Sequence, residues 1–349
     1  MQFFYSEHEA CRAHLDRYSQ FHRSALNGHL KDVSYIVYTC TSNGCAGLGD
    51  RLIGIITAFY VALLTQRVFL IDSSHPVDLD QVLSPNKIDW RFNRVNEIIG
   101  LPTGLSRMRD FNVEQRKVFL NEDFTSTYII SQMQRVQINQ RLYILMHQNP
   151  HFAKRRQELG LDQLSSFQLF GCLFHYLFAA TQLYRLLPSY NQLFYNPINH
   201  KRIPMIGMHI RTGSGVGEND RISKEDITKF LECGTKMLHE HPFSKILIMS
   251  DSQLVKDQAK QLYSDRAITL DLPIDHIDTV RTGNGNALKN TMTELLLLSK
   301  CDHFIISRSN FGEVATMIAF KPRIKIPQEQ CQVEKFEYEG FAQITHETD

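Results

Sequence analysis

The feature of this sequence that most constrains its fold is a strand, a glycine-bearing loop, a helix and a second strand in direct succession. The apolar run 34–39 predicts a buried strand, and the longer apolar segment 52–64 predicts a helix. Residues 67–72 predict a second buried strand. This strand–helix–strand unit is the building block of an α/β sheet with parallel strands. The loop before the helix ends in Asp50 and Arg51, a charge pair that no dinucleotide-binding fingerprint requires.

A second series of strands and helices begins near residue 204. Residues 195–204 hold two prolines and several polar residues, which is typical of a linker. Ser223 is expected to cap a helix, because early acidic residues follow it. The other elements predicted in this series are strands at 204–211, 245–250, 303–307 and 323–326, and helices at 252–263, 289–300 and 311–320.

The rest of the chain is less regular. The first thirty residues predict an amphipathic helix on the outside, residues 127–131 predict a strand, and residues 134–191 are strongly helical in pattern. We therefore expect two α/β domains in series. Their expected limits are 1–198, with helical insertions, and 199–326, followed by a tail at 327–349.

Charge and cysteine content exclude some classes of protein. The net charge of +1 gives no field that would attract nucleic acid. The seven cysteines lack metal-ligand spacing, which favours free thiols in a reducing compartment, although one or two disulfides remain compatible. No secretory signal is visible, and the apolar segment 52–64 is shorter than the roughly 20 residues that span a bilayer. The oligomeric state is not predicted.

The carboxyl ends of the predicted strands offer the candidate binding residues, because ligands bind there in open α/β sheets. His209 and Arg211 are two residues apart and project to the same face of one strand. A guanidinium beside a glycine-rich turn suits bidentate binding of phosphate oxygens. The alternative for Arg211 is an ion pair with a neighbouring carboxylate.

Two other strand ends carry polar side chains. Ser309 and Asn310 lie between a predicted strand and a helix, where hydroxyl and N–H groups can hold an anion or simply cap the helix. Asp251 follows another strand, where it can accept hydrogen bonds from a nucleoside or cap the next helix.

Five short motifs, taken in their order, resemble the GDP-fucose-dependent fucosyltransferases. They are 47–51, 209–211, 250–252, 301–305 and 309–315. The runs 47–72 and 309–315 are most similar to the plant xyloglucan-type α-1,2-fucosyltransferases. The α-1,6- and protein O-fucosyltransferases share the His-x-Arg strand. The resemblance extends from about residue 34 to residue 322, with much of the middle unmatched.

This resemblance implies a GT-B fold, in which two Rossmann-like domains face each other across a cleft, with the donor in the C-terminal domain and the acceptor in the N-terminal one. It implies inverting transfer of L-fucose from GDP-L-fucose to a hydroxyl of a glycan acceptor, without a metal or other cofactor. The net charge predicts no nucleic-acid partner, and the short apolar segment predicts no transmembrane segment. A cytoplasmic location follows from the sequence as it stands, and the Golgi lumen follows if it is part of a longer protein.

The resemblance also implies roles for individual residues. Arg211 would bind the β-phosphate, His209 would lie near the ribose, and Asp251 would lie near the nucleoside. Where a metal is absent, arginine and a helix N-terminus neutralise the departing diphosphate. The remaining residues expected to bind the donor are Gly47, Gly49, Arg51, Ser309, Asn310 and Phe311. The Asp-x-Asp at 78–80 lies far from the strand ends and is interpreted as chance.

The catalytic base is left open among three carboxylates. Asp50 departs from the family, whose members often carry asparagine there, and it could accept the proton of the acceptor hydroxyl. It could equally tether Arg51 or cap the following helix. Glu218 and Asp220 are rivals, because their loop follows Arg211. A donor such as GDP-mannose and a non-catalytic glycan-binding protein are the alternative functions.

Overall fold

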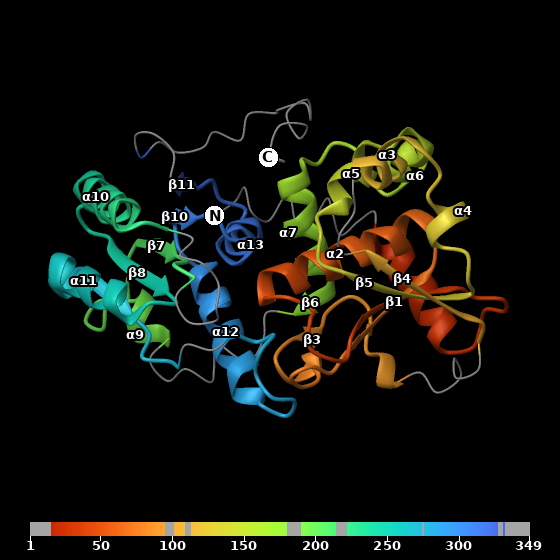
Figure 1. The fold of residues 1–349 in the computed structure, drawn as a ribbon, viewed down its shortest axis with the longest axis horizontal. Coiled ribbons are helices and arrows are strands. Elements are labelled where there is room, and N and C mark those ends of the chain that lie inside the picture. Colours follow the sequence, from red (N-terminus) through yellow and green to blue (C-terminus); the bar gives the residue numbers. More distant parts are fainter. Residues whose placement is uncertain are drawn as a thin grey trace. The chain divides into compact units, whose positions relative to one another are not determined.

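The computed structural model describes residues 15–94, 101–108, 113–179, 190–213, 222–273, 276–326 and 331. The chain forms two compact units (Figure 1). The first comprises Met1–Pro188 and Leu272–Leu295, and the second comprises Ser189–Asp271 and Leu296–Asp349. The first unit thus includes a segment that the sequence assigned to the second domain. Among the described residues this segment is fastened by hydrogen bonds such as that from the N–H of Gly283 to the carbonyl of Pro76 (2.6 Å), which join residues far apart in sequence.

The first unit is built on a sheet of four parallel strands in the order β2-β1-β5-β4. The strands are β1 (Tyr35–Cys40), β2 (Val68–Ser73), β4 (Thr103–Met108) and β5 (Met133–Ile138). The two strands predicted for the strand–helix–strand unit are confirmed to within one residue. β4 was missed, and the helical pattern predicted from residue 134 is wrong at its start, where β5 is a strand, because polar residues interrupt the apolar pattern of both strands.

The strand predicted at 127–131 is wrong. Thr125–Tyr128 form a short helix, α4, instead. The carboxylate of Asp123 accepts hydrogen bonds from the N–H and the hydroxyl of Thr125, which starts a helical turn at this point.

α2 (Leu48–Thr65) is the central helix of the first unit. It packs on β1, β2 and β5, and on α5 (Leu142–Gln148) and α7 (Ser166–Leu177). Gly54 lets it approach the sheet, since a Cβ at this position would lie 1.9 Å from the carbonyl oxygen of Ile138. Among the described residues α2 alone is long and apolar enough to cross a membrane, but 89% of it is buried inside the unit, as in a core helix.

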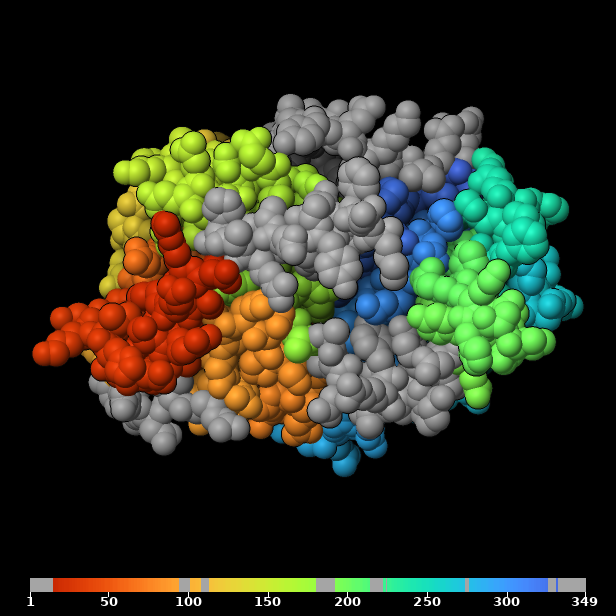
Figure 2. Space-filling view, turned by 180° about the vertical axis from the view of Figure 1, so that it is seen from behind, coloured from red at the N-terminus to blue at the C-terminus, as the bar shows by residue number. Residues whose placement is uncertain are grey.

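A helical segment at residues 15–26 covers the edge of this sheet, as expected for the N-terminal region. The hydroxyl of Tyr18 donates to the carbonyl of Arg67 (2.8 Å), and His22 is hydrogen-bonded to the carbonyl of Phe69 (2.9 Å). These bonds occupy the backbone beside the edge strand β2, which would otherwise be open to pairing with another chain. In Figure 2 this N-terminal part, coloured red, lies at the surface beside the orange part of the same unit.

Shorter elements complete the first unit. β3 (Ser84–Pro85) pairs antiparallel with β6 (Phe178–Ala179). The other helices are η1 (Leu79–Gln81), η2 (Phe92–Arg94), α3 (Val113–Asn121), η4 (Pro150–Phe152) and α6 (Ala153–Glu158).

The second unit contains five parallel strands in the order β11-β10-β7-β8-β9. The strands are β7 (Met205–Ile210), β8 (Lys245–Ser250), β9 (Ala267–Thr269), β10 (His303–Ser307) and β11 (Ile324–Ile326). The strands predicted in this half are confirmed, and β9 was missed. The helices are α9 (Tyr190–Phe194), α10 (Lys224–Glu240), α11 (Gln253–Tyr263), η5 (Ser264–Arg266), α12 (Gly285–Leu298), which crosses from the first unit, and α13 (Asn310–Ala319).

Helices cover both faces of the second sheet. On one face α10 and α11 pack through Phe230, Met237 and Val255 against β7 and β8. On the other face a Cβ at Gly207 would lie 2.7 Å from the side chain of Leu298, and one at Gly312 would lie 3.0 Å from His209. α12 and α13 therefore lie close against β7. Parallel strands with helices on both faces make this unit a doubly wound α/β domain.

Candidate donor site and glycine loop

The strand order of the second unit identifies where a ligand would bind. β7 and β10 are neighbours, and the chain leaves them toward opposite sides of the sheet, because β8 follows on one side and β11 on the other. Such a switch point opens a crevice beyond the carboxyl ends of the two strands. The predicted residues His209 and Arg211 lie at the end of β7, and Ser309 and Asn310 lie just after β10.

Hydrogen bonds and ring contacts join these two strand ends. The N–H of Arg211 donates to the hydroxyl of Ser307 at 3.0 Å, and the same hydroxyl lies 3.4 Å from Nδ1 of His209. The rings of His209 and Phe311 are stacked with centroids 5.1 Å apart. The structure therefore brings the His-x-Arg motif and the start of α13 together, as a shared binding site requires.

The Arg211 guanidinium is oriented by a carboxylate. Its Nη1 lies 2.9 Å from Oδ2 of Asp251, and the two side chains are 17% and 9% exposed. Asp251 also accepts hydrogen bonds from the N–H of Thr212 (2.7 Å), the hydroxyl of Thr212 (3.0 Å) and the N–H of Gly213 (2.9 Å). Asp251 thus shapes the loop after β7. The N-cap of α11 is Ser252, so Asp251 is not the cap of that helix.

His209 is neutral near pH 7. Burial lowers its pKa to about 4, with Asp251 opposing the shift and Arg211 adding to it. A neutral imidazole offers one donor and one acceptor and no charge. Arg211 is consequently the member of the His-x-Arg pair that can balance a phosphate.

The first residues of α13 are held as a helix cap. The hydroxyl of Ser309 accepts the N–H of Phe311 at 3.3 Å, so Ser309 is the N-cap. The cap does not exclude an anion, because a helix N-terminus has several N–H groups and a positive dipole end. Contacts of Ser309, Asn310 and Phe311 with a pyrophosphate stay predictions. Glu218 and Asp220, the two rival bases, lie outside the described residues.

In the first unit the glycine loop is shorter than the sequence suggested. Gly47 is the N-cap of α2, so Gly49, Asp50 and Arg51 lie in the first turn of the helix rather than in the loop. Leu48, the first residue of the helix, is already buried, as Leu52 one turn later is. The Asp50 carboxylate lies close to Gly47, since a Cβ there would be 3.4 Å from Oδ2. An acidic residue in the first turn also interacts favourably with the helix dipole.

Arg51 is the most buried arginine of this region, with 4% of its surface exposed. Its guanidinium donates to the carbonyls of Ala46 (2.9 Å), His75 (2.5 Å) and Ile277 (3.4 Å) and pairs with Asp278 at 3.3 Å. Burial lowers the pKa of Arg51, and the nearby Tyr38 and Asp278 oppose that shift. All these partners belong to the first unit, so Arg51 ties together its loops. Donor contacts of Gly47, Gly49 and Arg51 remain predictions.

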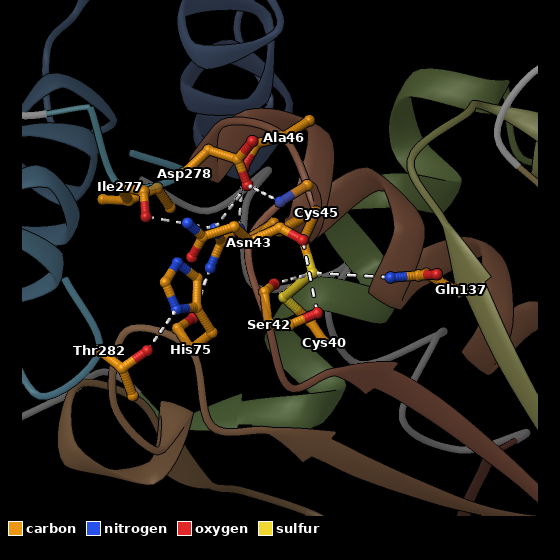
Figure 3. Close-up of a disulfide and its surroundings, with 12 residues drawn as sticks. Cys40, Ser42, Asn43, Cys45, Ala46, His75, Gln137, Ile277, Asp278 and Thr282 are labelled. Carbon is orange, nitrogen blue, oxygen red and sulfur yellow. Dashed lines mark hydrogen bonds and ion pairs between the residues drawn. A yellow bond between two sulfur atoms is a disulfide. The ribbon is translucent and has the colours of Figure 1, made fainter. Parts of the chain in front are cut away.

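Asp278 is a residue of this network that sequence reasoning missed. Its Oδ1 accepts the N–H of Gly44 at 2.9 Å, across 234 positions of sequence. On the same segment, the hydroxyl of Thr282 lies 3.3 Å from Nδ1 of His75. Figure 3 shows Asp278 next to the glycine loop and Thr282 beside His75. No local pattern around Asp278 signals such a contact.

The expectation of free thiols is wrong. Cys40 and Cys45 form a disulfide that closes the glycine loop (Figure 3), and Cys233 and Cys331 form a second. Cys172 is also disulfide-bonded. The single free thiol among the described residues is the buried Cys301, whose pKa is raised by burial. The Cα atoms are 5.9 Å apart in the first pair, which is five positions apart in sequence, and 5.5 Å apart in the second, which joins residues 98 positions apart.

No group of three or more histidine, cysteine or acidic side chains that could hold a metal lies together in the described part of the chain. Asp78 begins the helix η1 without a side-chain cap bond. Independence from metal remains a prediction.

Comparison with known proteins finds a family match for the start of the first unit. Residues 3–92 match the family model of xyloglucan fucosyltransferase. No curated protein matches the chain at a significant level. The family match covers the strand, glycine loop and helix at the start of the first unit.

Solved structures extend the similarity to most of the chain. An arginine-to-lysine mutant of Arabidopsis thaliana FUT1, solved in complex with GDP, has a TM-score of 0.63 and 17% sequence identity, over 91% of this chain and 79% of that one. Fucosyltransferase NodZ from Bradyrhizobium has a TM-score of 0.50 and 14% identity, over 84% of this chain and 94% of that one. These comparisons confirm the GT-B fold class, and they bear out the resemblance to fucosyltransferases through the xyloglucan fucosyltransferase model at residues 3–92 and the fold shared with FUT1.

Proposed function

We propose that this protein is an inverting, metal-independent glycosyltransferase that moves L-fucose from GDP-L-fucose to a hydroxyl of a glycan acceptor. The observation that carries the proposal is Arg211 at the switch point of the second sheet, held by Asp251 and joined through Ser307 to the start of α13. The family match in the first unit and the fold shared with FUT1, which was solved with GDP, support the choice of donor.

The chemistry follows from the charges that develop. The bond between C1 of fucose and the β-phosphate oxygen breaks, GDP leaves with the bonding electrons, and the acceptor oxygen bonds to C1 from the opposite face. The Arg211 guanidinium would stabilise the departing diphosphate, and its pairing with Asp251 fixes its orientation before the donor arrives. The proton of the acceptor hydroxyl would pass to a carboxylate, for which Asp50 is our first choice and Glu218 and Asp220 are the rivals.

The donor assignment is tested by release of nucleotide and by thermal stability. We expect turnover of GDP-fucose in the presence of EDTA, and a higher melting temperature with GDP than with UDP, because a ligand that binds only the folded state stabilises it by mass action. Faster turnover of GDP-mannose would favour the other donor. Binding of a glycan without any turnover would favour the non-catalytic alternative. Strict dependence on manganese would contradict the metal-independent proposal.

We also propose that the protein works in an oxidising compartment such as the Golgi lumen, in place of the cytoplasm. The disulfides at Cys40–Cys45 and Cys233–Cys331 support this location, because such bonds are rare in reducing compartments. Peptide mapping of the native protein without reductant should recover both linked pairs. Recovery of all four as free thiols would contradict the proposal.

A further inference from the structure

The Asp278 carboxylate connects two groups at the start of α2. A single oxygen, Oδ1, accepts the N–H of Gly44 at 2.9 Å and lies 3.3 Å from Nη2 of Arg51. Gly44 is in the glycine loop, whereas Arg51 is in the first turn of the helix that follows the loop. Asp278 therefore sets the position of the loop relative to the helix turn that carries Asp50.

The glycine loop has a backbone shape that needs support. Gly44 has φ of 88° and Ala46 has φ of 67°, and the second value is unfavourable for a residue with a side chain. The carbonyl of Ala46 is held by Nε of Arg51, and the N–H of Gly44 is held by Asp278. The Cys40–Cys45 disulfide closes the same loop, and the Asp278 carboxylate adds the hydrogen bond that holds the Gly44 N–H.

Burial makes the charge of Asp278 matter. Arg51 is 4% exposed and Asp278 is 21% exposed. The other hydrogen bonds of this guanidinium go to the neutral carbonyl oxygens of Ala46, His75 and Ile277, so loss of the carboxylate would leave a buried cation without its paired anion.

Other bonds keep the Asp278 segment in place when that carboxylate is changed. The N–H of Gly283 donates to the carbonyl of Pro76, and Thr282 contacts His75. A substitution at Asp278 should therefore act on the loop and on Arg51 and leave the segment attached.

We propose that Asp278 is a positioning residue of the fucosyl transfer reaction, which holds the glycine loop and Arg51 so that the adjacent Asp50 is set to receive the acceptor proton. This inference rests on the proposed function. It assigns Asp278 no contact with either substrate.

The test compares Asp278→Ala and Asp278→Asn with the control Asp78→Ala, an exposed residue of the same unit whose side chain makes no cap bond. Asparagine keeps an oxygen for the Gly44 N–H but cannot neutralise Arg51, and alanine removes both. We expect Asp278→Ala to lower kcat for transfer by about 10²-fold, since small misplacements of reacting groups have effects of that size. Hydrolysis of GDP-fucose should fall much less than transfer does, because Arg211 and its neighbours belong to the other unit.

Hydrogen exchange of the Gly44 amide provides a readout that does not depend on activity. We expect faster exchange in Asp278→Ala and near-native exchange in Asp278→Asn and Asp78→Ala. An unchanged ratio of transfer to hydrolysis in folded Asp278→Ala, or unchanged exchange at Gly44, would overturn the proposal. If Asp278→Ala does not fold, a lowered transfer-to-hydrolysis ratio in Asp278→Asn supports the proposal and an unchanged ratio overturns it. Failure of the wild type to use GDP-fucose would instead contradict the proposed function, while the exchange data would still decide whether Asp278 holds the loop.

Discussion

Arg51 and Arg211 both lie at junctions between a strand and a helix, but their surroundings give them different tasks. Arg51 is 4% exposed and donates to carbonyls of three separate loops of the first unit. Arg211 is 17% exposed and pairs with the Asp251 carboxylate at the switch point of the second sheet. The charge pair at Asp50 and Arg51 is thus explained in part. The arginine holds the loops in place, and the Asp50 carboxylate is the candidate catalytic base.

The role of Asp50 is tested by its asparagine variant. Asparagine preserves the shape and hydrogen bonding of the side chain but cannot take a proton at neutral pH. If Asp50 is the base, Asp50→Asn should lower transfer about 10²- to 10⁴-fold and leave hydrolysis of GDP-fucose much less affected. Ratios of transfer to hydrolysis measured for Asp50→Asn, Glu218→Gln and Asp220→Asn decide among the three carboxylates. Equal ratios across all three would rule out a single catalytic carboxylate.

At the scale of elements, the packing of α2 depends on the close approach of Gly54 to the end of β5. A Cβ at Gly54 would lie 1.9 Å from the carbonyl oxygen of Ile138 at the end of β5. Gly54→Ala should therefore lower the free energy of unfolding by about 1–3 kcal/mol, because backbone atoms cannot move aside as a flexible side chain can.

Gly285→Ala is the matched control for this prediction. A Cβ at Gly285, the first residue of α12, would meet its nearest neighbour at 3.5 Å, which is ordinary contact. The control should be neutral or slightly stabilising, since alanine restricts the unfolded chain. Urea unfolding measures both variants. Equal stability of Gly54→Ala and the wild type would show that α2 does not need this contact.

The elements that could be predicted from sequence are those that form one continuous run of buried, mostly apolar residues. β1, β8 and β10 are nearly all apolar, and Ser223 caps α10 as its acidic neighbours indicated. β5 was missed because Gln134, Arg135 and Gln137 interrupt its apolar pattern. The His-x-Arg site was predictable because its residues lie at the carboxyl end of a strand that the sequence pattern identifies. Asp278 and the Cys233–Cys331 disulfide were not predictable, because their partners meet only after the chain has folded.

At the scale of the whole molecule, buried neutral histidines make stability depend on pH. Burial lowers the pKa values of His22, His147 and His209 to about 4 each. His147 is held as a neutral ring between the hydroxyl of Tyr60 (2.7 Å) and the carbonyl of Leu164 (2.9 Å). The unfolded chain binds protons more tightly at all three, so their contribution is complete above pH about 6.5 and is lost as the pH falls toward 4.

The expected size of this effect is measurable by unfolding at two pH values. Between pH 7.5 and pH 5.5 each histidine should cost about 1.4 kcal/mol, or about 4 kcal/mol for the three together. His147→Gln should reduce the dependence by about the share of one buried histidine. A wild-type protein equally stable at both pH values would show that these rings are not buried as neutral groups.

Arg211 is expected to stabilise the departing diphosphate of GDP-fucose. The most direct test is the rate of GDP release in EDTA. It compares Arg211→Ala and Arg211→Lys with the exposed control Arg281→Ala. Arg211→Ala should keep its fold, because Asp251 still accepts hydrogen bonds from the N–H and the hydroxyl of Thr212 and from the N–H of Gly213. We predict a loss of about 2–4 kcal/mol of transition-state stabilisation, or about 30- to 1,000-fold in rate. Lysine should recover only part of it, because the forked geometry is lost, and the control should match the wild type. GDP release from folded Arg211→Ala at the wild-type rate would contradict the account.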